Sequence, residues 1–333
     1  MALTTSLNTF LARIGARQAP TQPNPDYFPY LELKGPAPGP HIFITAGIHG
    51  DEAAGIITVH ELLKLLETTP LLSGKLSIIP CCNPQALAAR TRHHPTSKQD
   101  LNRLFPGSKK ATHALLLAHA IYRKVEKARP DLLIDIHNDW YNSVPYAIIN
   151  EESDYKSPLT YKKSLHMAQL LNLPVVSEDL TQPHHAGLEK SLSGYASLQG
   201  GIPALTLEAG GSPIVSEYDV EIAVQILTNL LQKLGMVGPQ PAFSSTVPKA
   251  YLGQVLEYAS CPPPKVAGII RYRALAGQLV EAGQTLAEIF SPSGELLQTI
   301  TTQQKALVLG HADEPYVTPK TDIYALALPP SSK

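Results

Sequence analysis

Cysteine and tryptophan are scarce in this sequence, and long apolar runs are missing from it. Its 333 residues include only 3 cysteines, with Cys81 and Cys82 adjacent and Cys261 far away. This usage offers no disulfide framework and fits a reducing compartment. No run is long enough to span a bilayer, and arginines interrupt the N-terminal stretch where a signal peptide needs its apolar core. We therefore expect a cytoplasmic protein that does not bind a membrane.

A surplus of charge is also lacking. The formal net charge is -1, so the sequence has no electrostatic footprint for nucleic acid. The motif G-x-S-x-G is absent as well, which leaves a serine hydrolase without support. What is present is 44% apolar and 17% charged residues, the balance of a folded globular protein, together with 12 histidines. The length is sufficient for two domains.

The first two thirds of the chain alternate between apolar strands and amphipathic helices. The run HIFITA at 41–46 predicts a buried strand, and the segment after it has apolar residues at helical spacing, namely Ile56, Val59, Leu62, Leu63 and Leu66. Further strands are expected at 76–82, 132–136, 145–150, 173–176 and 204–208, and further helices at 111–129, 158–171 and 217–234. This order predicts an α/β domain, residues 1–240, with a mixed, mostly parallel sheet flanked by helices.

The pattern changes near residue 238. A linker containing Pro and Ser leads into a tail of short apolar segments separated by Gly, Pro and Asp turn signals, with little helical periodicity. We therefore predict a second, all-β domain at residues 241–333.

A histidine and a glutamate follow the strand at 41–46. Open α/β sheets place reactive groups just beyond the carboxyl ends of their strands, which is where His49 and Glu52 stand. Such a pair supplies two of the three protein ligands of a typical catalytic zinc and leaves a position for water. The spacing alone is not specific, because His311 and Glu314 repeat it in the tail, where we expect a turn and no metal.

Two more strand ends carry chemistry-bearing residues. His137 follows the strand at 132–136 and is flanked by Asp135 and Asp139, so it is either the third metal ligand, oriented by a carboxylate, or a hydrogen-bonded histidine at a strand end. Glu208 ends the apolar run at 204–208. It is either a general base that takes a proton from metal-activated water or a glutamate that faces solvent.

The segment 83–107 is a long polar loop rich in arginine and asparagine. Arginine presents a fixed fork of donors that suits carboxylates and developing oxyanions. Arg90, Arg92 and Arg103 cannot all be catalytic, and each has an alternative as a solvated surface residue. Asp100 is expected to brace the loop.

Five motifs occur in one order across residues 41–211: HGDE, NPQAL…TR, DLNRLFPG, DIHND and TLEAGG. With these, the chain resembles the succinylglutamate desuccinylase/aspartoacylase branch of the zinc carboxypeptidase superfamily. The resemblance implies a carboxypeptidase-like catalytic domain followed by a small barrel. The tail is similar to that barrel through a lipoyl-like motif, G-Q-x-V-x-x-G-Q, at 277–284.

The resemblance also implies a cofactor, one zinc ion per chain held by His49, Glu52 and His137. Histidine and glutamate accept other divalent metals too, so the sequence leaves the identity of the metal open.

Roles for the remaining residues follow from the same resemblance. Glu208 becomes the general base and acid, and Arg92 polarises the scissile carbonyl. Asn102 and Arg103 hold a substrate carboxylate. The carboxypeptidases also use a mobile tyrosine; Tyr195 is the best candidate here, with a core or surface tyrosine as the alternative.

The expected function is hydrolysis of the amide bond of a small N-acyl amino acid. One alternative is a metallocarboxypeptidase or murein-peptide amidase acting on a short peptide, and another is an inactive binding protein. The loop at 93–99 is longer than in the aspartoacylases, so their acyl preference does not transfer. A homo-oligomer is compatible with the sequence.

Overall fold

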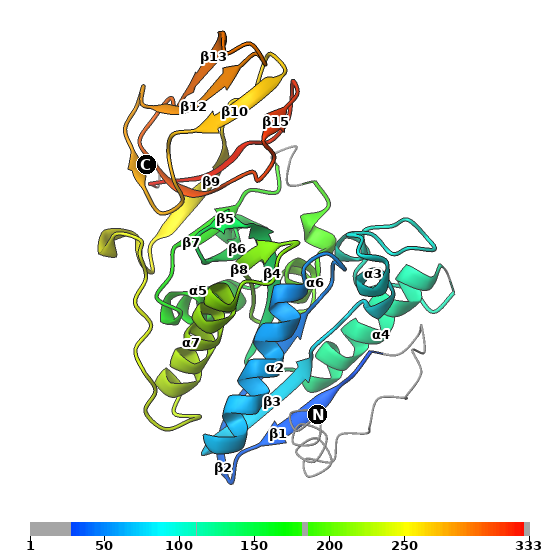
Figure 1. Ribbon diagram of the computed structural model, residues 1–333. Coiled ribbons are helices and arrows are strands. Elements are labelled where there is room, and N and C mark those ends of the chain that lie inside the picture. The colour runs from blue at the N-terminus through cyan, green and yellow to red at the C-terminus, as the bar shows by residue number, and fades with distance from the viewer. Residues whose placement is uncertain (1–27, 111, 182–185, 330–333) are drawn as a thin grey trace, which may run out of the picture.

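The structure is a computed structural model that describes residues 28–110, 112–181 and 186–329 (Figure 1). The N-terminal arginines behind the expectation about a signal peptide lie outside these residues. The helices are α2 (Ala53–Thr68), α3 (Pro84–Ala89), η1 (Leu101–Arg103), α4 (His113–Ala128), η2 (Glu152–Asp154), α5 (Pro158–Leu170), η4 (Leu188–Lys190), α6 (Leu192–Leu198), α7 (Glu217–Lys233) and η5 (Lys249–Tyr251).

The strands alternate with the helices as far as α7 and then follow one another. They are β1 (Leu31–Lys34), β2 (Ala37–Ala46), β3 (Ser73–Ile79), β4 (Leu132–Trp140), β5 (Asn142–Ser143), β6 (Tyr146–Asn150), β7 (Val175–Glu178), β8 (Ala204–Ser212), β9 (Val255–Ser260), β10 (Gly268–Tyr272), β11 (Leu279–Val280), β12 (Thr285–Phe290), β13 (Leu296–Thr301), β14 (Ala306–His311), β15 (Tyr316–Val317) and β16 (Tyr324–Leu328).

One large mixed sheet organises the molecule. Its strand order is β1-β3-β2-β4-β8-β6-β7-β9-β16-β14-β11, with β5 paired to β14. The pairs β3–β2, β2–β4, β4–β8, β6–β7 and β7–β9 are parallel, whereas β1 and β6 run antiparallel to their neighbours β3 and β8. The prediction of a mixed, largely parallel sheet with flanking helices is therefore confirmed.

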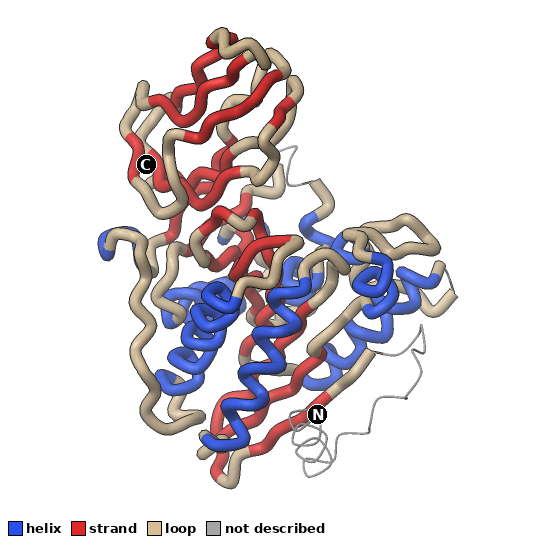
Figure 2. The backbone as a smooth tube through the Cα atoms, in the orientation of Figure 1, coloured by secondary structure: helices blue, strands red, loops and turns tan. Residues whose placement is uncertain are grey.

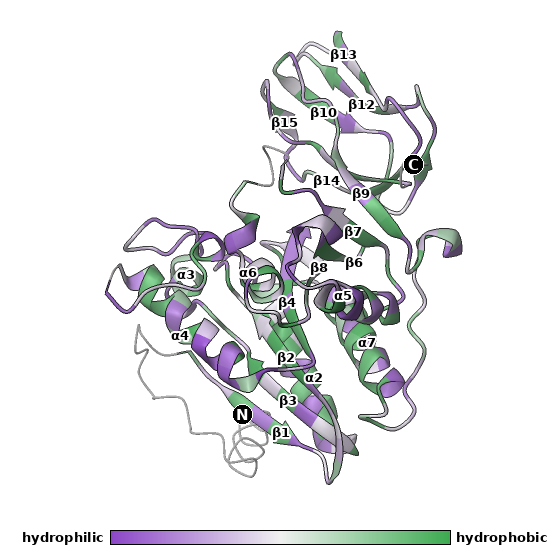
Figure 3. Ribbon diagram, turned by 180° about the vertical axis from the view of Figure 1, so that it is seen from behind, coloured by the Kyte–Doolittle hydropathy of each residue, from purple (hydrophilic) through white to green (hydrophobic). Residues whose placement is uncertain are grey.

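Two helical layers cover the sheet because its strands are apolar on both faces. Along β2, Ile42 and Ile44 pack with α2 and α7, while Phe43 packs with α4 and α6 on the other side. The tube drawing shows α2 and α7 side by side over the strands (Figure 2). Seen from behind, the strands between the layers are mostly hydrophobic (Figure 3). This double covering leaves the strand ends as the place for polar side chains.

Helix α2 starts directly after two of the predicted metal ligands, His49 and Glu52. Its buried positions include the five residues expected from the spacing, Ile56 to Leu66, which confirms that apolar stripe. The turn before it passes so close to α3 that a Cβ on Gly50 would stand 2.0 Å from the carbonyl carbon of Ala86. Only glycine allows this approach, which brings the turn against the segment that carries Arg92.

The tail is all β apart from η5. A four-stranded sheet, β13-β12-β10-β15, packs with β14 and β16 around a core of its own. The tail is nevertheless joined to the first sheet, because β9 pairs with β7 in parallel. The boundary at 240/241 and the lipoyl-like character of the tail remain predictions. Among the helices of the described ranges, none has the length and apolarity needed to cross a membrane.

Candidate functional site

Three neighbouring parallel strands bring the predicted ligands together. His49 and Glu52 follow β2, and His137 lies near the end of β4, beside β2 in the sheet. Glu208 lies on β8, directly opposite His137 in the register. Because the carboxyl ends of parallel strands meet at one edge, residues far apart in the sequence become neighbours.

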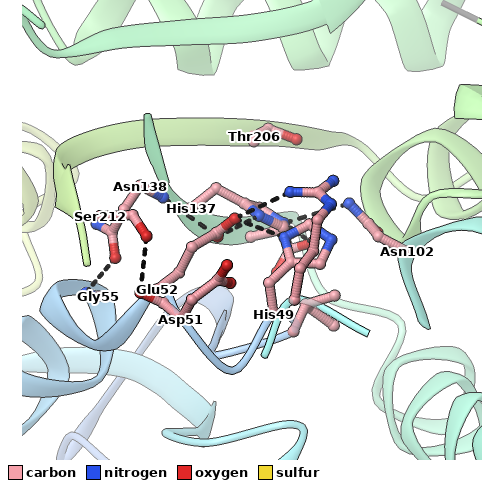
Figure 4. A network of polar contacts seen from close by, with 12 residues as sticks. His49, Asp51, Glu52, Gly55, Asn102, His137, Asn138, Thr206 and Ser212 are labelled. Atoms are coloured by element: carbon pink, nitrogen blue, oxygen red, sulfur yellow. Dashed lines mark hydrogen bonds and ion pairs between the residues drawn. The ribbon is translucent and has the colours of Figure 1, made fainter. Parts of the chain in front are cut away.

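The two histidines face one carboxylate (Figure 4). His49 Nδ1 lies 2.6 Å from Glu52 Oε1, and His137 Nδ1 lies 2.8 Å from Glu52 Oε2. All three side chains are buried, and one ligand atom from each lies within 4.8 Å of the others. These are the donor types and the spacing that a small cation requires.

A second layer of carboxylates holds the far side of each imidazole. His49 Nε2 lies 3.1 Å from Asp100 Oδ1, and His137 Nε2 lies 3.1 Å from Asp135 Oδ2. Thr45, beside Asp135 in the register, donates to the other oxygen of that carboxylate at 2.6 Å. Such partners fix the tautomer and orientation of ligand histidines. Of the two aspartates that flank His137, only Asp135 has this role.

Asn138 also holds the carboxylate of Glu52 in place. Its backbone N–H donates to Glu52 Oε2 at 3.3 Å, and its side-chain oxygen accepts from the N–H of Gly55 in the first turn of α2. Its amide nitrogen donates to the carbonyl of Ala209 on β8. Asn138 thus ties α2 to β4 and β8 (Figure 4). This role of Asn138 was not predicted, because only its position after the histidine marks it in the sequence.

The charges around the imidazoles suit a cation. Burial alone lowers the pKa of His137, but the carboxylates of Glu52 and Asp135 outweigh it and raise that pKa well above its usual range. Burial raises the pKa of Glu52, and the two histidines reverse this and leave it below its ordinary value. Binding of a metal ion in general displaces protons from its ligand residues. The residues therefore fit a divalent metal.

Glu208 lines the same cavity as the three candidate ligands. Its Oε2 atom is buried and has no hydrogen-bond partner among the described residues. Burial raises the pKa of Glu208 well above its ordinary value, although His137 lowers it. Tyr146 stands opposite Glu208 in the register between β6 and β8, and its hydroxyl donates to Asp139 Oδ2 at 2.9 Å. Asp139 thus serves a tyrosine rather than a metal ligand.

Arg92 and Arg103 reach the site and Arg90 does not. Arg92 contacts Glu52 Oε1 at 3.4 Å and Asp100 Oδ2 at 3.3 Å. The Arg103 guanidinium donates to the carbonyl of Asn102 at 2.9 Å. Arg90, by contrast, is exposed at the end of α3 in a left-handed conformation.

Asn102 connects the site to helix α6. Its Oδ1 atom accepts from the N–H of Leu192 at 2.9 Å, at the start of α6, and its amide nitrogen lies 3.4 Å from His137 Nε2. The segment predicted as a loop therefore contains two short helices, α3 and η1, and η1 presents Asn102 and Arg103.

Tyr195 is not brought to the site. Its ring packs edge-on against Tyr122, 5.0 Å between centroids, in the core on the α4 side of the sheet. Among the described tyrosines, Tyr146 and Tyr258 line the cavity. Cys81 and Cys82 are buried free thiols, and burial raises the pKa of each, to about 11 for Cys81.

A single cavity of about 320 Å³ connects these groups. The three candidate ligands, Glu208 and both arginines line one part of it. The remainder extends along β6 and β7 to Glu178, and the tail contributes Tyr258 and Asp322. The last three residues were not predicted, because no motif marks them.

Comparison with known proteins agrees with this geometry. A family model described as the succinylglutamate desuccinylase/aspartoacylase catalytic domain matches residues 38–234. The N-alpha-acetyl-L-2,4-diaminobutyric acid deacetylase of Halomonas elongata is 24% identical over 255 residues, which are 76% of this chain and 71% of the relative.

Solved structures share the fold over nearly the whole chain. A succinylglutamate desuccinylase/aspartoacylase from Rhodobacter sphaeroides superposes with a TM-score of 0.71 at 21% identity, covering 90% of this chain and 88% of the other. An aspartoacylase family protein from Mesorhizobium loti gives 0.70 at 24% identity, with 91% and 89% covered. The product-bound ectoine utilization protein EutE (DoeB) from Ruegeria pomeroyi gives 0.69 at 22% identity, with 90% and 89% covered.

Proposed function

Because the chain belongs to the succinylglutamate desuccinylase/aspartoacylase family, an enzyme family that hydrolyses amide bonds, we propose that it is a zinc-dependent deacylase of small N-acyl amino acids. The observation that carries the proposal is the meeting of three buried donors, a carboxylate with a free oxygen and two arginines in one cavity. His49, Glu52 and His137 would hold the zinc ion. Bound there, zinc supplies Lewis-acid activation of water and of the amide carbonyl.

Glu208 moves the proton. Its carboxylate accepts a proton from the attacking water and then delivers it to the departing nitrogen, so that the products are a carboxylate and a free amine. The burial that raises its pKa supports the second half of this task, because a carboxyl group with a raised pKa holds its proton until the amine leaves. The mechanism therefore needs no other proton carrier.

The two arginines would bind negative charge on the substrate. Arg92, held by Glu52 and Asp100, lines the cavity and would stabilise the negative charge that develops on the carbonyl oxygen. A donor aimed at such a charge is worth about 3–4 kcal/mol of transition-state stabilisation. Arg103 on η1 binds the substrate carboxylate, together with Asn102, and so orients the amide.

Small substrates are favoured over peptides because the tail closes one side of the cavity. Tyr258 and Asp322, which line it, both come from beyond residue 240. A peptide substrate of a carboxypeptidase or a murein-peptide amidase is longer than an acyl amino acid, and a cavity of about 320 Å³ with this wall leaves it little room. The deacylase is therefore preferred to the peptidase.

The test is a substrate screen on protein of known metal content. We expect about one zinc per chain by elemental analysis, and amine release from one or more N-acyl amino acids in preference to dipeptides and tripeptides. A chelator should abolish turnover and added Zn²⁺ should restore it. A zinc-loaded chain that releases amine from no acyl amino acid, or that prefers peptides, would contradict the proposal.

A further inference from the structure

The cavity is longer than the metal site, and its far part has no task in the chemistry described above. One face of the large sheet forms its floor. Tyr146 stands opposite Glu208 where β6 meets β8, and Asn150 stands opposite Glu178 where β6 meets β7. Because side chains alternate along a strand, Tyr146 and Asn150 point to the same face, and Glu178 joins them there.

The tail continues this floor. On β9, Leu256 stands opposite Val176 and Glu257 opposite Ser177, so Tyr258 is the next position along and lies beside Glu178. Both Tyr258 and Glu178 line the cavity. Glu178 of β7 and Tyr258 of the tail thus form a common wall.

The Glu178 carboxylate is short of positive partners. In the part of the chain that the structure describes, no side chain donates a hydrogen bond to it or forms an ion pair with it within 4.0 Å. Arg103 is near enough to act on its charge, but the guanidinium of Arg103 donates instead to the carbonyl of Asn102. The wall also carries Asp322, so this end of the cavity is acidic.

The pKa values of Glu178 and Tyr258 reflect the shortage of positive charge at this end of the cavity. Burial raises the pKa of Glu178 to about 7, although Arg103 and His137 lower it. Burial raises the pKa of the Tyr258 hydroxyl, and the negative charges of Asp139, Glu178 and Asp322 raise it further. Glu178 is half-buried, and a carboxylate without an ionic partner in such a place is costly unless water or a ligand compensates its charge.

We propose that Glu178 determines substrate specificity by binding an ammonium group that the substrate carries in addition to the carboxylate held by Arg103. The proposal deepens the deacylase function and rests on it. Arg103 and Glu178 act on one another's charge across the cavity, so together they match a molecule with both a carboxylate and an amine. The substrate class is therefore the monoacylated diamino acids.

The ammonium group has two possible sources in this class. In an Nα-acyl diamino acid it is the side-chain amine, and in an Nω-acyl diamino acid it is the α-amine. The experiment includes one pair of compounds for each source. Each pair compares a cationic compound with a neutral one of similar shape: Nα-acetyl-2,4-diaminobutyrate with Nα-acetylnorvaline, and Nγ-acetyl-2,4-diaminobutyrate with 4-acetamidobutyrate.

We expect the zinc-loaded wild-type protein to favour the cationic member of one pair by at least tenfold in kcat/KM. Glu178→Gln should remove the preference, mainly through a rise in KM for the cationic compound, and should change the neutral one by less than about threefold. Glu178→Asp keeps the charge and should restore part of the preference. Glu152→Gln, which changes an exposed glutamate beyond the end of β6, serves as the matched control and should behave like wild type.

Two outcomes would overturn the inference. One is a wild-type protein without preference in either pair. The other is a Glu178→Gln variant that loses activity equally on cationic and neutral compounds, since that result assigns Glu178 to the positioning of Arg103.

Calorimetric binding of free 2,4-diaminobutyrate and norvaline separates this test from that of the deacylase function. Tighter binding of the diamine, lost in Glu178→Gln, supports the ammonium site even if no acyl compound is turned over. Equal binding of both amino acids by a chain that does hydrolyse acyl amino acids would overturn only the ammonium site.

Discussion

The cavity has a metal end, formed by His49, Glu52 and His137, and a far end at β7, formed around Glu178. At the metal end every ring nitrogen of His49 and His137 has a carboxylate oxygen within 3.1 Å. At the far end the carboxylate of Glu178 has no oppositely charged or hydrogen-bonding side chain beside it among the described residues. The first end has its geometry set by the protein itself, as catalysis requires. The second end leaves a charge to be matched by the substrate. Chemistry and selectivity are thus assigned to different strands of one sheet.

The largest effect is expected from Glu208→Gln, which breaks the metal end without touching a ligand. The amide cannot accept the proton of water, so kcat should fall by about 10³-fold. Zinc content should stay at the wild-type level, because Glu208 is not one of the three donors. Steady-state kinetics and elemental analysis on the same preparation measure both quantities.

Glu221→Gln provides the control, since Glu221 is exposed on α7, away from the cavity. A Glu208→Gln variant with wild-type turnover would remove Glu208 from the mechanism. A variant that has lost its zinc would instead make Glu208 part of the metal site.

The next effect concerns Arg92→Gln. Loss of a donor to the developing oxyanion should lower kcat by about 10²-fold with little change in KM. Arg90→Gln is the matched control, because Arg90 lies two residues away in the same segment and is exposed. Equal losses in the two variants would mean that the segment, and not the Arg92 guanidinium, is what matters.

A smaller effect, on zinc affinity, tests whether the metal end and the far end of the cavity act independently. Asp135→Asn removes the carboxylate behind His137 and should weaken zinc binding by about 10–100-fold. Glu178→Gln should leave zinc affinity within about twofold of wild type, since Glu178 contacts no candidate ligand. Competition with a chromogenic chelator measures both affinities, and equal weakening in the two variants would show that the ends are not independent.

The sequence allowed the metal end to be predicted because each of its residues lies within a local motif at a strand end. His49, Glu52, His137 and Glu208 all follow or close apolar runs that were assigned correctly as strands. The residues that hold the candidate ligands in place were harder to predict. Asp100 was expected to brace its loop, and it does accept from the N–H of Asn102, but it also holds His49 across the fold.

The far end could not be predicted for a physical reason. Glu178 and Tyr258 become neighbours only through the register of β7 with β9, and Tyr146 meets Glu208 only because β6 runs antiparallel to β8. Strand order and direction depend on packing of the whole domain, and no local pattern encodes them. The helix α6 was missed similarly, because its short segment has too few residues to display a period.

The smallest effect is a pH dependence of stability that arises at the far end. Glu178 has a pKa of about 7 in the folded chain and an ordinary value of 4.5 when unfolded, so the folded chain binds the extra proton between these limits. Its stabilising contribution is complete below pH 4.5 and is lost as the pH rises through 7. Glu178→Gln has no such proton, so its unfolding free energy relative to wild type should increase between pH 5 and pH 8.

Calorimetry on chelator-treated protein measures this difference, because a bound cation in the cavity would add its own charge. The expected increase is about 1–3 kcal/mol, which follows from the displacement of the pKa. Glu152→Gln, with its exposed side chain, should show no pH-dependent difference from wild type. If Glu178→Gln is equally displaced at both pH values, the carboxylate is already paired in the empty cavity. In that case the far end would not differ from the metal end in the pairing of its charged groups.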